Sequence, residues 1–383
     1  MQRLYFLLAL ILLGCANKAQ ERTSEILPGA YQTEEYLPLL EGKKVGLTVN
    51  HSSLIGSTHL TDSLLKHGIQ ITKVFTPEHG FTGTISDGVL VEYDSTESSF
   101  ELISLYGKNK KPTDQELTGL DIMVFDIQDV GARFYTYIST MHYAMEACAE
   151  NNIPFIILDR PNPNGSYVDG PVLDTALQSF VGMHPIPIVH GMTVGELAQM
   201  INEEGWLNGQ AKADLRVVKM KNWNHRMKYS LPVNPSPNLP DDLSIALYPS
   251  LCLFEGTIMS VGRGTDYAFQ QIGHPEYPDT TYSFTPKSRE GAKWPPYENQ
   301  LCYGKSWIDQ EPEYEFTLQP LIDAYQLMNR EDFFNNYFKH LAGTNSLQKQ
   351  IEEGQTEEEI RSSWEPELSN FKKKRKQYLL YEQ

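Results

Sequence analysis

Positive charge is scarce in this chain. Its 383 residues include 32 lysines and arginines against 49 aspartates and glutamates, which gives a formal net charge of −17 and an isoelectric point near 5.0. A nucleic-acid partner would need a basic protein face to meet its phosphates, so the composition argues against nucleic-acid binding. The length is sufficient for two domains with sizeable cores.

Cysteine is also scarce. The four cysteines are Cys15, Cys148, Cys252 and Cys302, and no two of them form a Cys-x-x-Cys pair. Three cysteines follow Cys15, and an odd number cannot pair completely in an exported protein. We therefore expect mostly buried thiols, with one disulfide possible.

Several catalytic motifs are absent. The segment Val49–Ser53 follows the first predicted strand and lacks a Gly-x-Gly-x-x-Gly pattern, so we predict no dinucleotide cofactor. No Walker loop and no Gly-x-Ser-x-Gly elbow occur, which disfavours a P-loop enzyme and a serine hydrolase. No His-Glu-x-x-His spacing occurs either, so we predict no metal. A catalytic metal is the weaker alternative, because His51, His79, Asp126 and His190 could converge.

The N-terminus is typical of a bacterial lipoprotein signal. Arg3 precedes the apolar run Leu4–Leu13, which is too short to span a bilayer stably, and Gly14-Cys15 follows. Small residues before a cysteine resemble the lipobox, in which the cysteine sulfur is acylated after cleavage. We predict a signal peptide over 1–15, lipidation at Cys15 and a tether over 16–25. The protein would then be exported and held at a membrane of the cell envelope, facing the periplasm or the cell surface. No protein partner can be inferred.

Strands and helices alternate through the first part of the chain. This order predicts a mainly parallel, doubly wound α/β sheet over residues 26–230. Strands are expected over 43–51, 69–75, 101–106, 121–129, 153–158 and 214–220, and helices over 61–67, 139–151 and 193–205. Thr193 and Glu196 have the spacing of a capping box at the start of the last helix.

Four prolines lie within residues 231–240, and such a composition is typical of a crossing between domains. We therefore place a smaller C-terminal α/β (α+β) domain over 231–383. Helices are expected there over 316–328, 331–340, 351–363 and 364–380.

Polar side chains follow the predicted strands at their carboxyl ends. Ligands bind at this edge of an open α/β sheet, so we expect these side chains to share one crevice. They are Asn50 and His51, Glu78 and His79, Asp126 and Gln128, Asp159 and Arg160, and His190.

Carboxylates, amides, arginines and aromatic rings suit a sugar, whose hydroxyls bond to polar groups and whose apolar face stacks on rings. Glycoside hydrolysis usually needs two carboxylates. Glu78 is the predicted general acid, because Pro77 and Phe81 could partly desolvate it. Asp126 is the preferred second carboxylate and Asp159 the next. The structural alternatives are a solvated turn for Glu78, a turn cap for Asp126 and an internal ion pair of Asp159 with Arg160.

Six segments together resemble one family, the bacterial exo-β-N-acetylmuramidases, long known as a domain of unknown function. The likeness runs from about Gly42 to Tyr381. The segments that carry it are Thr76-Pro77-Glu78-His79-Gly80-Phe81, Ser104-Leu105-Tyr106-Gly107, the run from Phe125 to Tyr137, Leu158-Asp159-Arg160-Pro161-Asn162-Pro163, His190-Gly191-Met192-Thr193 with Gly195-Glu196, and Gly262-Arg263-Gly264-Thr265.

The resemblance implies an exo-acting glycoside hydrolase of the hexosaminidase type. It would release N-acetylmuramic acid from the non-reducing ends of peptidoglycan fragments, in a cleft between a Rossmann-like N-terminal domain and a smaller C-terminal α/β domain. The family's proposed catalytic glutamate falls on Glu78. With it we group Asp126 and His79 as catalytic. The predicted substrate-binding residues are Asn50, Gln128, Arg133, Tyr135, Tyr137, Asp159, Arg160, Asn162, His190 and Arg263. The lactyl carboxylate of the sugar would be bound by a cationic side chain, and the candidates for this role are Arg133, Arg160 and Arg263.

The chain departs from the family pattern at two places. Thr82 stands where an arginine is common, and Gly88-Val89 stands where a Gly-Glu pair is usual, with Glu92 nearby. These departures leave two alternatives open. One is a glycosidase for another cell-wall amino sugar, and the other is a non-catalytic, sugar-binding envelope lipoprotein.

Overall fold

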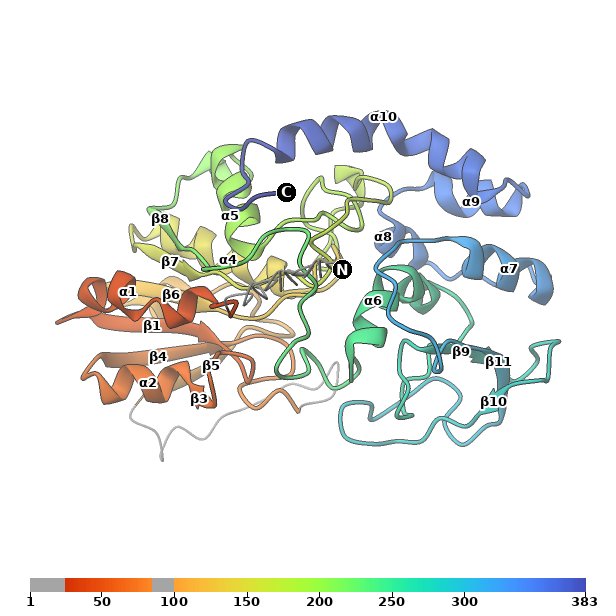
Figure 1. Ribbon diagram of the computed structural model, residues 1–383, viewed down its shortest axis with the longest axis horizontal. Coiled ribbons are helices and arrows are strands. Elements are labelled where there is room, and N and C mark those ends of the chain that lie inside the picture. The colour runs from red at the N-terminus through yellow and green to blue at the C-terminus, as the bar shows by residue number, and fades with distance from the viewer. Residues whose placement is uncertain (1–24, 85–99) are drawn as a thin grey trace, which may run out of the picture.

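The computed structural model describes residues 25–84 and 100–383, and Figure 1 shows them as two packed parts. The first part is built on a six-stranded sheet with the order β5-β4-β1-β6-β7-β8, in which every neighbouring pair is parallel. The strands are β1 (Lys44–Val49), β4 (Gln70–Thr76), β5 (Glu101–Ser104), β6 (Ile122–Asp126), β7 (Phe155–Leu158) and β8 (Leu215–Val218). The predicted parallel sheet is therefore confirmed.

Helices cover both faces of this sheet, because its central strands carry apolar side chains on both sides. On one face, Tyr36 and Leu64 pack in a core with Val45, and they come from α1 (Thr33–Leu40) and α2 (Leu60–Lys66). On the other face, Met141 and Leu197 pack in a core with Phe125, and they come from α4 (Tyr137–Glu150) and α5 (Val194–Glu203). The smaller elements are η1 (Gly29–Tyr31), β2 (Leu54–Ile55), β3 (Thr58–His59), α3 (Asp114–Leu117), η3 (Thr175–Leu177) and η4 (Asn208–Gln210).

The predicted capping box at the start of α5 is present. The Thr193 hydroxyl accepts from the Glu196 N–H at 3.2 Å, and the Glu196 carboxylate accepts from the Thr193 N–H at 2.9 Å. These bonds satisfy donors that the first turn of a helix leaves without a partner. They fix where α5 begins.

The second part follows the proline-rich segment and combines helices with a small antiparallel sheet of order β10-β11-β9. Its elements are α6 (Asp242–Leu251), η5 (Cys252–Gly256), β9 (Gln271–His274), β10 (Ser283–Phe284), β11 (Cys302–Ser306), α7 (Gln319–Met328), α8 (Phe338–Ala342), α9 (Ser346–Glu352) and α10 (Glu357–Arg375). This arrangement confirms a smaller C-terminal α+β unit.

Two helix predictions in this part were wrong in their bounds. The helix expected over 331–340 is reduced to α8, which begins at Phe338. The segments expected over 351–363 and 364–380 form one helix, α10, with α9 before it. The break lies at Gly354, whose φ of 76° is left-handed, and a capping box of Thr356 and Glu359 then starts α10.

The end of the chain returns to the first part. Helix α10 crosses from the second part toward α5 (Figure 1), and the residues after it contact the sheet domain. The Tyr381 hydroxyl donates to Asp159 Oδ2 at 2.7 Å, and the Leu380 N–H donates to Glu196 Oε1 at 2.8 Å. The two parts are thus joined by the proline-rich segment and by the C-terminus.

The three cysteines in the described chain, Cys148, Cys252 and Cys302, are buried free thiols. The optional disulfide among them is therefore not formed. Burial raises the pKa of the Cys302 thiol to about 11, so this group stays protonated at neutral pH.

Candidate active site

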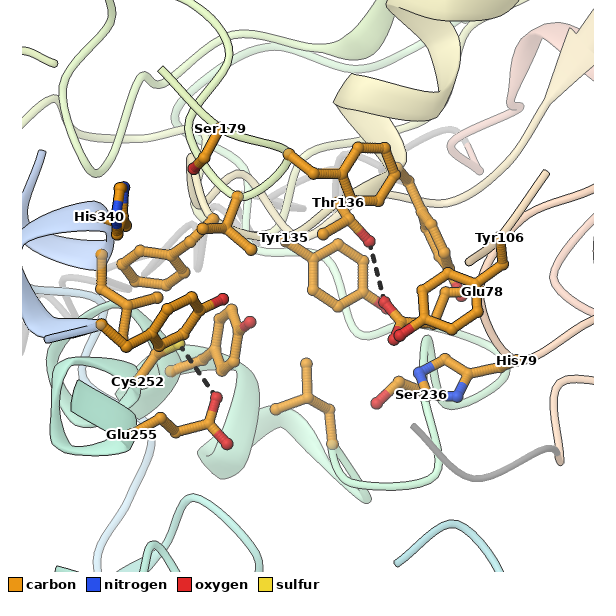
Figure 2. A pocket seen from close by; sticks show the side chains of 18 of the residues that line it. Glu78, His79, Tyr106, Tyr135, Thr136, Ser179, Ser236, Cys252, Glu255 and His340 are labelled. Carbon is orange, nitrogen blue, oxygen red and sulfur yellow. Dashed lines mark hydrogen bonds between the residues drawn. The ribbon is translucent and has the colours of Figure 1, made fainter. Parts of the chain in front are cut away.

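A cavity of about 830 Å³ lies between the two parts of the molecule. Loops after β4, β5 and β6 supply one wall, and residues from α6 to α8 supply the other, as Figure 2 shows for Glu78, Tyr135 and Glu255. The predicted residues that line it are Glu78, His79, Tyr135, Tyr137 and Arg263. The cavity confirms that strand ends of the sheet form a crevice, although not all of them reach it.

The turn after β4 positions Glu78 and His79. Strand β4 ends at Thr76, and the Gly80 N–H donates to the Pro77 carbonyl at 3.0 Å. His79 has a φ of 68° and Gly80 a φ of 71°, so two successive residues are left-handed. This conformation is costly for histidine, and such strain is concentrated at functional sites. The turn stops the strand and places both side chains in the cavity lining.

Glu78 is half-buried, and its carboxylate faces the cavity. Its Oε2 atom accepts a hydrogen bond from the Thr136 hydroxyl at 3.1 Å (Figure 2). Thr136 directly precedes α4, so the start of that helix fixes the orientation of the carboxylate. No lysine or arginine of the described chain forms an ion pair with Glu78.

Glu255 is a second carboxylate in the lining, contributed by the opposite wall. Its Oε1 atom lies 2.5 Å from Arg263 Nε, and the Arg263 guanidinium lies 5.0 Å from the centre of the Phe269 ring. Burial raises the pKa of Tyr337, and the nearby carboxylates of Glu255 and Glu78 add to this effect. Tyr337 is therefore close enough to interact electrostatically with carboxylates from both walls of the cavity.

Tyr135 and Tyr137 line the cavity with their rings, but their hydroxyls point elsewhere. Both hydroxyls donate to the Pro235 carbonyl, at 2.8 Å and 3.3 Å, and the two rings pack edge to face. Pro235 belongs to the segment between the two parts. These tyrosines therefore position that segment and offer ring surface to a ligand.

The structure does not place Asp126 or Arg160 in the cavity. Arg160 Nε and Nη2 donate to the two oxygens of Asp126, at 2.5 Å and 2.8 Å, and both side chains are buried. The predicted internal ion pair of Arg160 with Asp159 was wrong in its partner. Asp126 is the carboxylate that β6 places beneath the crevice, where it has a structural role.

Asp159 is also buried, below the start of α5. Its carboxylate accepts from the Thr193 hydroxyl at 2.7 Å, the Gly195 N–H at 2.9 Å and the Tyr381 hydroxyl at 2.7 Å. Burial raises the pKa of Asp159 to about 6. The residue joins three segments of the fold and does not line the cavity.

Arg133 is fully buried between the two parts and is not available to a substrate. Its two terminal nitrogens donate to four carbonyl oxygens, those of Pro171, Ile186, Leu341 and Ala342, at 2.7–2.9 Å. Two of these carbonyls lie at the end of α8, where a cation is favoured by the helix dipole. Desolvation lowers the pKa of the guanidinium to about 9.

Four other predicted binding residues are buried outside the cavity lining. Asn50 accepts from Ser52, Gln128 donates to the Pro161 carbonyl at 2.7 Å, and Asn162 donates to the Met192 carbonyl at 2.8 Å. His190 accepts from the Met192 N–H at 3.2 Å, and burial lowers its pKa to about 3. These side chains organise the loops below the crevice, and their assignment as substrate ligands stays a prediction.

Several lining residues were not among the predicted site residues. They are Tyr106, Lys110, Phe134, Thr136, Ser179, Phe180, Tyr248, Glu255, Tyr337 and His340 among others. Tyr106 was visible in a family segment, and Glu255 lies shortly before the Gly262–Thr265 segment. Phe134 and Thr136 lie within the family segment from Phe125 to Tyr137, and the remaining residues named here lie outside the family segments.

Some predictions fall outside the described residues, namely the signal and lipidation site at Cys15, the Gly88-Val89 departure and Glu92. Within residues 25–84 and 100–383, no group of three or more His, Cys, Asp or Glu side chains is arranged to hold a metal ion.

The sequence and the fold match known proteins over most of their length. Family models described as the N-terminal and C-terminal parts of exo-β-N-acetylmuramidase NamZ match residues 45–243 and 246–381. The peptidoglycan β-N-acetylmuramidase NamZ of Bacillus subtilis is 40% identical, with 95% of this chain and 92% of that protein covered. The domain division that we placed at residue 231 stays a prediction.

Two crystal structures of DUF1343 family proteins from Bacteroides fragilis have the same fold. One has a TM-score of 0.87 at 45% identity and covers 94% of this chain and 99% of that chain. The other has a TM-score of 0.79 at 27% identity, with 93% and 99% covered.

Proposed function

The chain belongs to the exo-β-N-acetylmuramidase NamZ family, and from this we propose that it releases N-acetylmuramic acid from the non-reducing ends of peptidoglycan fragments. It is a glycoside hydrolase of the exo-acting hexosaminidase type. The cavity between the two parts is lined by aromatic rings, which suits a sugar.

Glu78 is the proposed general acid, which protonates the glycosidic oxygen as the bond to the sugar breaks. The observation that carries this role is the contrast between the two carboxylates in the lining. Glu255 is committed to its ion pair with Arg263, whereas Glu78 faces the cavity with a threonine hydroxyl as its partner. Glu78 is therefore the carboxyl group in the lining that no lysine or arginine of the described chain engages.

His79 and the two tyrosines would support this chemistry. His79 lies beside Glu78 in the lining, held there by the left-handed turn. Tyr135 and Tyr137 present ring surface on which the apolar face of a sugar can stack. The second participant in the reaction is not assigned to Asp126 or Asp159, because both are buried outside the cavity.

The activity is tested by comparing two chromogenic substrates, a β-N-acetylmuraminide and the matching β-N-acetylglucosaminide. We expect release of the chromophore from the first and little from the second. Preference for the glucosaminide would favour a glycosidase for another amino sugar. Binding of the muraminide without turnover would favour a sugar-binding lipoprotein.

We further propose that the protein is an exported lipoprotein anchored through Cys15. The support is the sequence, in which an apolar run of signal-peptide length ends at Leu13-Gly14-Cys15. No helix in the described part of the chain is long and apolar enough to cross a membrane. Expression of the full chain with labelled fatty acid is expected to label the wild type and move it to the membrane fraction. Cys15→Ser should remove both effects, and labelling of that variant would contradict the proposal.

A further inference from the structure

The cationic side chains around the cavity differ in whether they already have a hydrogen-bond or ion-pair partner in the protein. Arg133 and Arg160 are buried away from it, with carbonyls and Asp126 as partners. Arg263 lines the cavity, but Glu255 lies 2.5 Å from its Nε atom. The three arginines that the sequence offered for a substrate carboxylate are therefore either absent from the cavity or already paired.

Lys110 is the remaining cation of the described lining. It lies on the loop between β5 and α3, and its ammonium sits 4.3 Å from the centre of the Phe180 ring. No carboxylate of the described chain pairs with it. The neighbouring Lys111 differs, because its ammonium lies 2.7 Å from Glu146 and 2.6 Å from Glu150. The loop thus directs Lys111 to helix α4 and Lys110 to the cavity.

Phe180 gives the Lys110 ammonium a fixed support. The Phe180 ring stacks on Tyr143 of α4, with centroids 6.3 Å apart and planes inclined by 11°. Its carbonyl accepts from the Ser139 hydroxyl, also of α4, at 2.7 Å. A cation above an aromatic ring is held in place while its outer face stays open to a ligand. Holding the ammonium in this way reduces the entropy lost when an anion binds.

We propose that Lys110, supported by Phe180, forms a carboxylate-binding subsite for the lactyl group of the terminal muramic acid. The assignment rests on the proposed function. N-acetylmuramic acid differs from N-acetylglucosamine by a lactyl ether on O3, whose carboxylate is ionised at neutral pH. With Arg263 paired to Glu255, the Lys110 charge is the one left in the described lining to balance this anion.

The test combines two variants with two substrates. Lys110→Met removes the charge and keeps an unbranched side chain of similar length, and Lys110→Arg keeps a charge. Lys108→Met is the matched control, because Lys108 is exposed on the same loop outside the cavity lining. Each protein is assayed on a chromogenic β-N-acetylmuraminide with a free lactyl carboxylate and on the same compound as its lactyl methylamide.

On the free acid, we expect Lys110→Met to lower kcat/KM by about 10- to 100-fold, the usual range for a lost charge-assisted hydrogen bond. Most of the loss should appear in KM. On the methylamide, Lys110→Met and the wild type should be equal within about twofold. Lys110→Arg should keep most of the activity on the acid, and Lys108→Met should match the wild type on both compounds.

Two results would overturn the subsite. One is an equal loss on the acid and the methylamide in Lys110→Met, which would indicate a general structural effect. The other is no loss on the acid. Neither is confused with failure of the proposed function, because in that case the wild type itself would not cleave the muraminide.

Discussion

Arg160 binds Asp126 through two hydrogen bonds, although Asp159 directly precedes it in the chain. The side chain of Arg160 extends across from the end of β7 to the end of β6, and both partners are buried. Asp159 meanwhile accepts from α5 and from the C-terminus. This exchange of partners removes both aspartates from the cavity lining, where Glu78 is the proposed catalytic carboxyl group.

The buried ion pair should matter for stability and much less for chemistry. In Asp126→Ala, the Arg160 guanidinium loses its carboxylate and stays buried, which typically costs about 3–5 kcal/mol. Urea unfolding measures this loss, and Asp126→Leu combined with Arg160→Met should recover most of it. At a temperature where Asp126→Ala is folded, kcat should fall by less than about tenfold. A loss of kcat without loss of stability would instead return Asp126 to the catalytic group.

Replacing Glu78 should lower kcat and leave stability unchanged, which is the opposite of the effect expected for Asp126. Glu78→Gln keeps the shape of the side chain and its contact with Thr136 but removes the proton donor. We expect kcat on the β-N-acetylmuraminide to fall by at least ~100-fold, with an unchanged melting temperature. Glu35→Gln is a suitable control, since Glu35 is exposed on α1, outside the cavity lining. Near-normal turnover in Glu78→Gln would contradict the assignment of Glu78 as the general acid.

Alanine substitutions at two glycines, Gly343 and Gly354, test how tightly Arg133 is packed. Gly343 and Gly354 have nearly the same left-handed φ, 75° and 76°, so alanine strains the backbone equally at both, by about 1–2 kcal/mol. A Cβ at Gly343 would lie 2.3 Å from Arg133 Nη2, whereas a Cβ at Gly354 meets nothing within 4 Å.

Because Arg133 is held by four carbonyls, it cannot move without breaking hydrogen bonds. We expect Gly343→Ala to cost about 1–3 kcal/mol more than Gly354→Ala in urea unfolding. Equal costs would mean that the guanidinium is free to shift.

The buried carboxyl of Asp129 should make stability depend on pH. Burial raises its pKa from 3.8 to about 7, and its Oδ2 atom has no hydrogen-bond partner among residues 25–84 and 100–383. Between these two pKa values the folded state binds more protons than the unfolded state, so this group makes stability fall as pH rises from about 4 to about 7.

Asp129→Asn keeps an acceptor for the Gly131 N–H and cannot ionise. Relative to this variant, the wild type should lose on the order of 2–4 kcal/mol of unfolding free energy across that pH range. Parallel unfolding curves at pH 4, 5.5 and 7 measure the difference. A constant difference across the series would contradict the expected titration.

The sheet could be predicted from the sequence because burial on both faces leaves continuous apolar runs. Segments such as Ile122–Asp126 have no other stable environment, and the helices between them follow from their spacing. The C-terminal helices were harder to place. A single glycine at 354 and the Thr356 capping box decide where α9 ends and α10 begins, and such local features shift a boundary by several residues.

The site was predictable only in part, for a geometric reason. Sequence order places a residue at the end of a strand, but it does not say whether the side chain points up into a crevice or down between the loops. Glu78 points into the cavity, whereas Asp126 and Asn50 are held beneath it. The opposite wall, including Glu255, depends on how the second part packs against the first. The spacing of residues in the sequence does not predict this packing.

The bond from Tyr381 to Asp159 has a consequence for how the molecule is made. Asp159 belongs to the first part of the chain, yet one of its hydrogen-bond donors is the third residue from the last. The first domain therefore cannot reach its final state during synthesis of its own segment and must wait for the C-terminus. An affinity tag fused directly after Gln383 would lie next to this late contact, so a purification handle is better placed elsewhere.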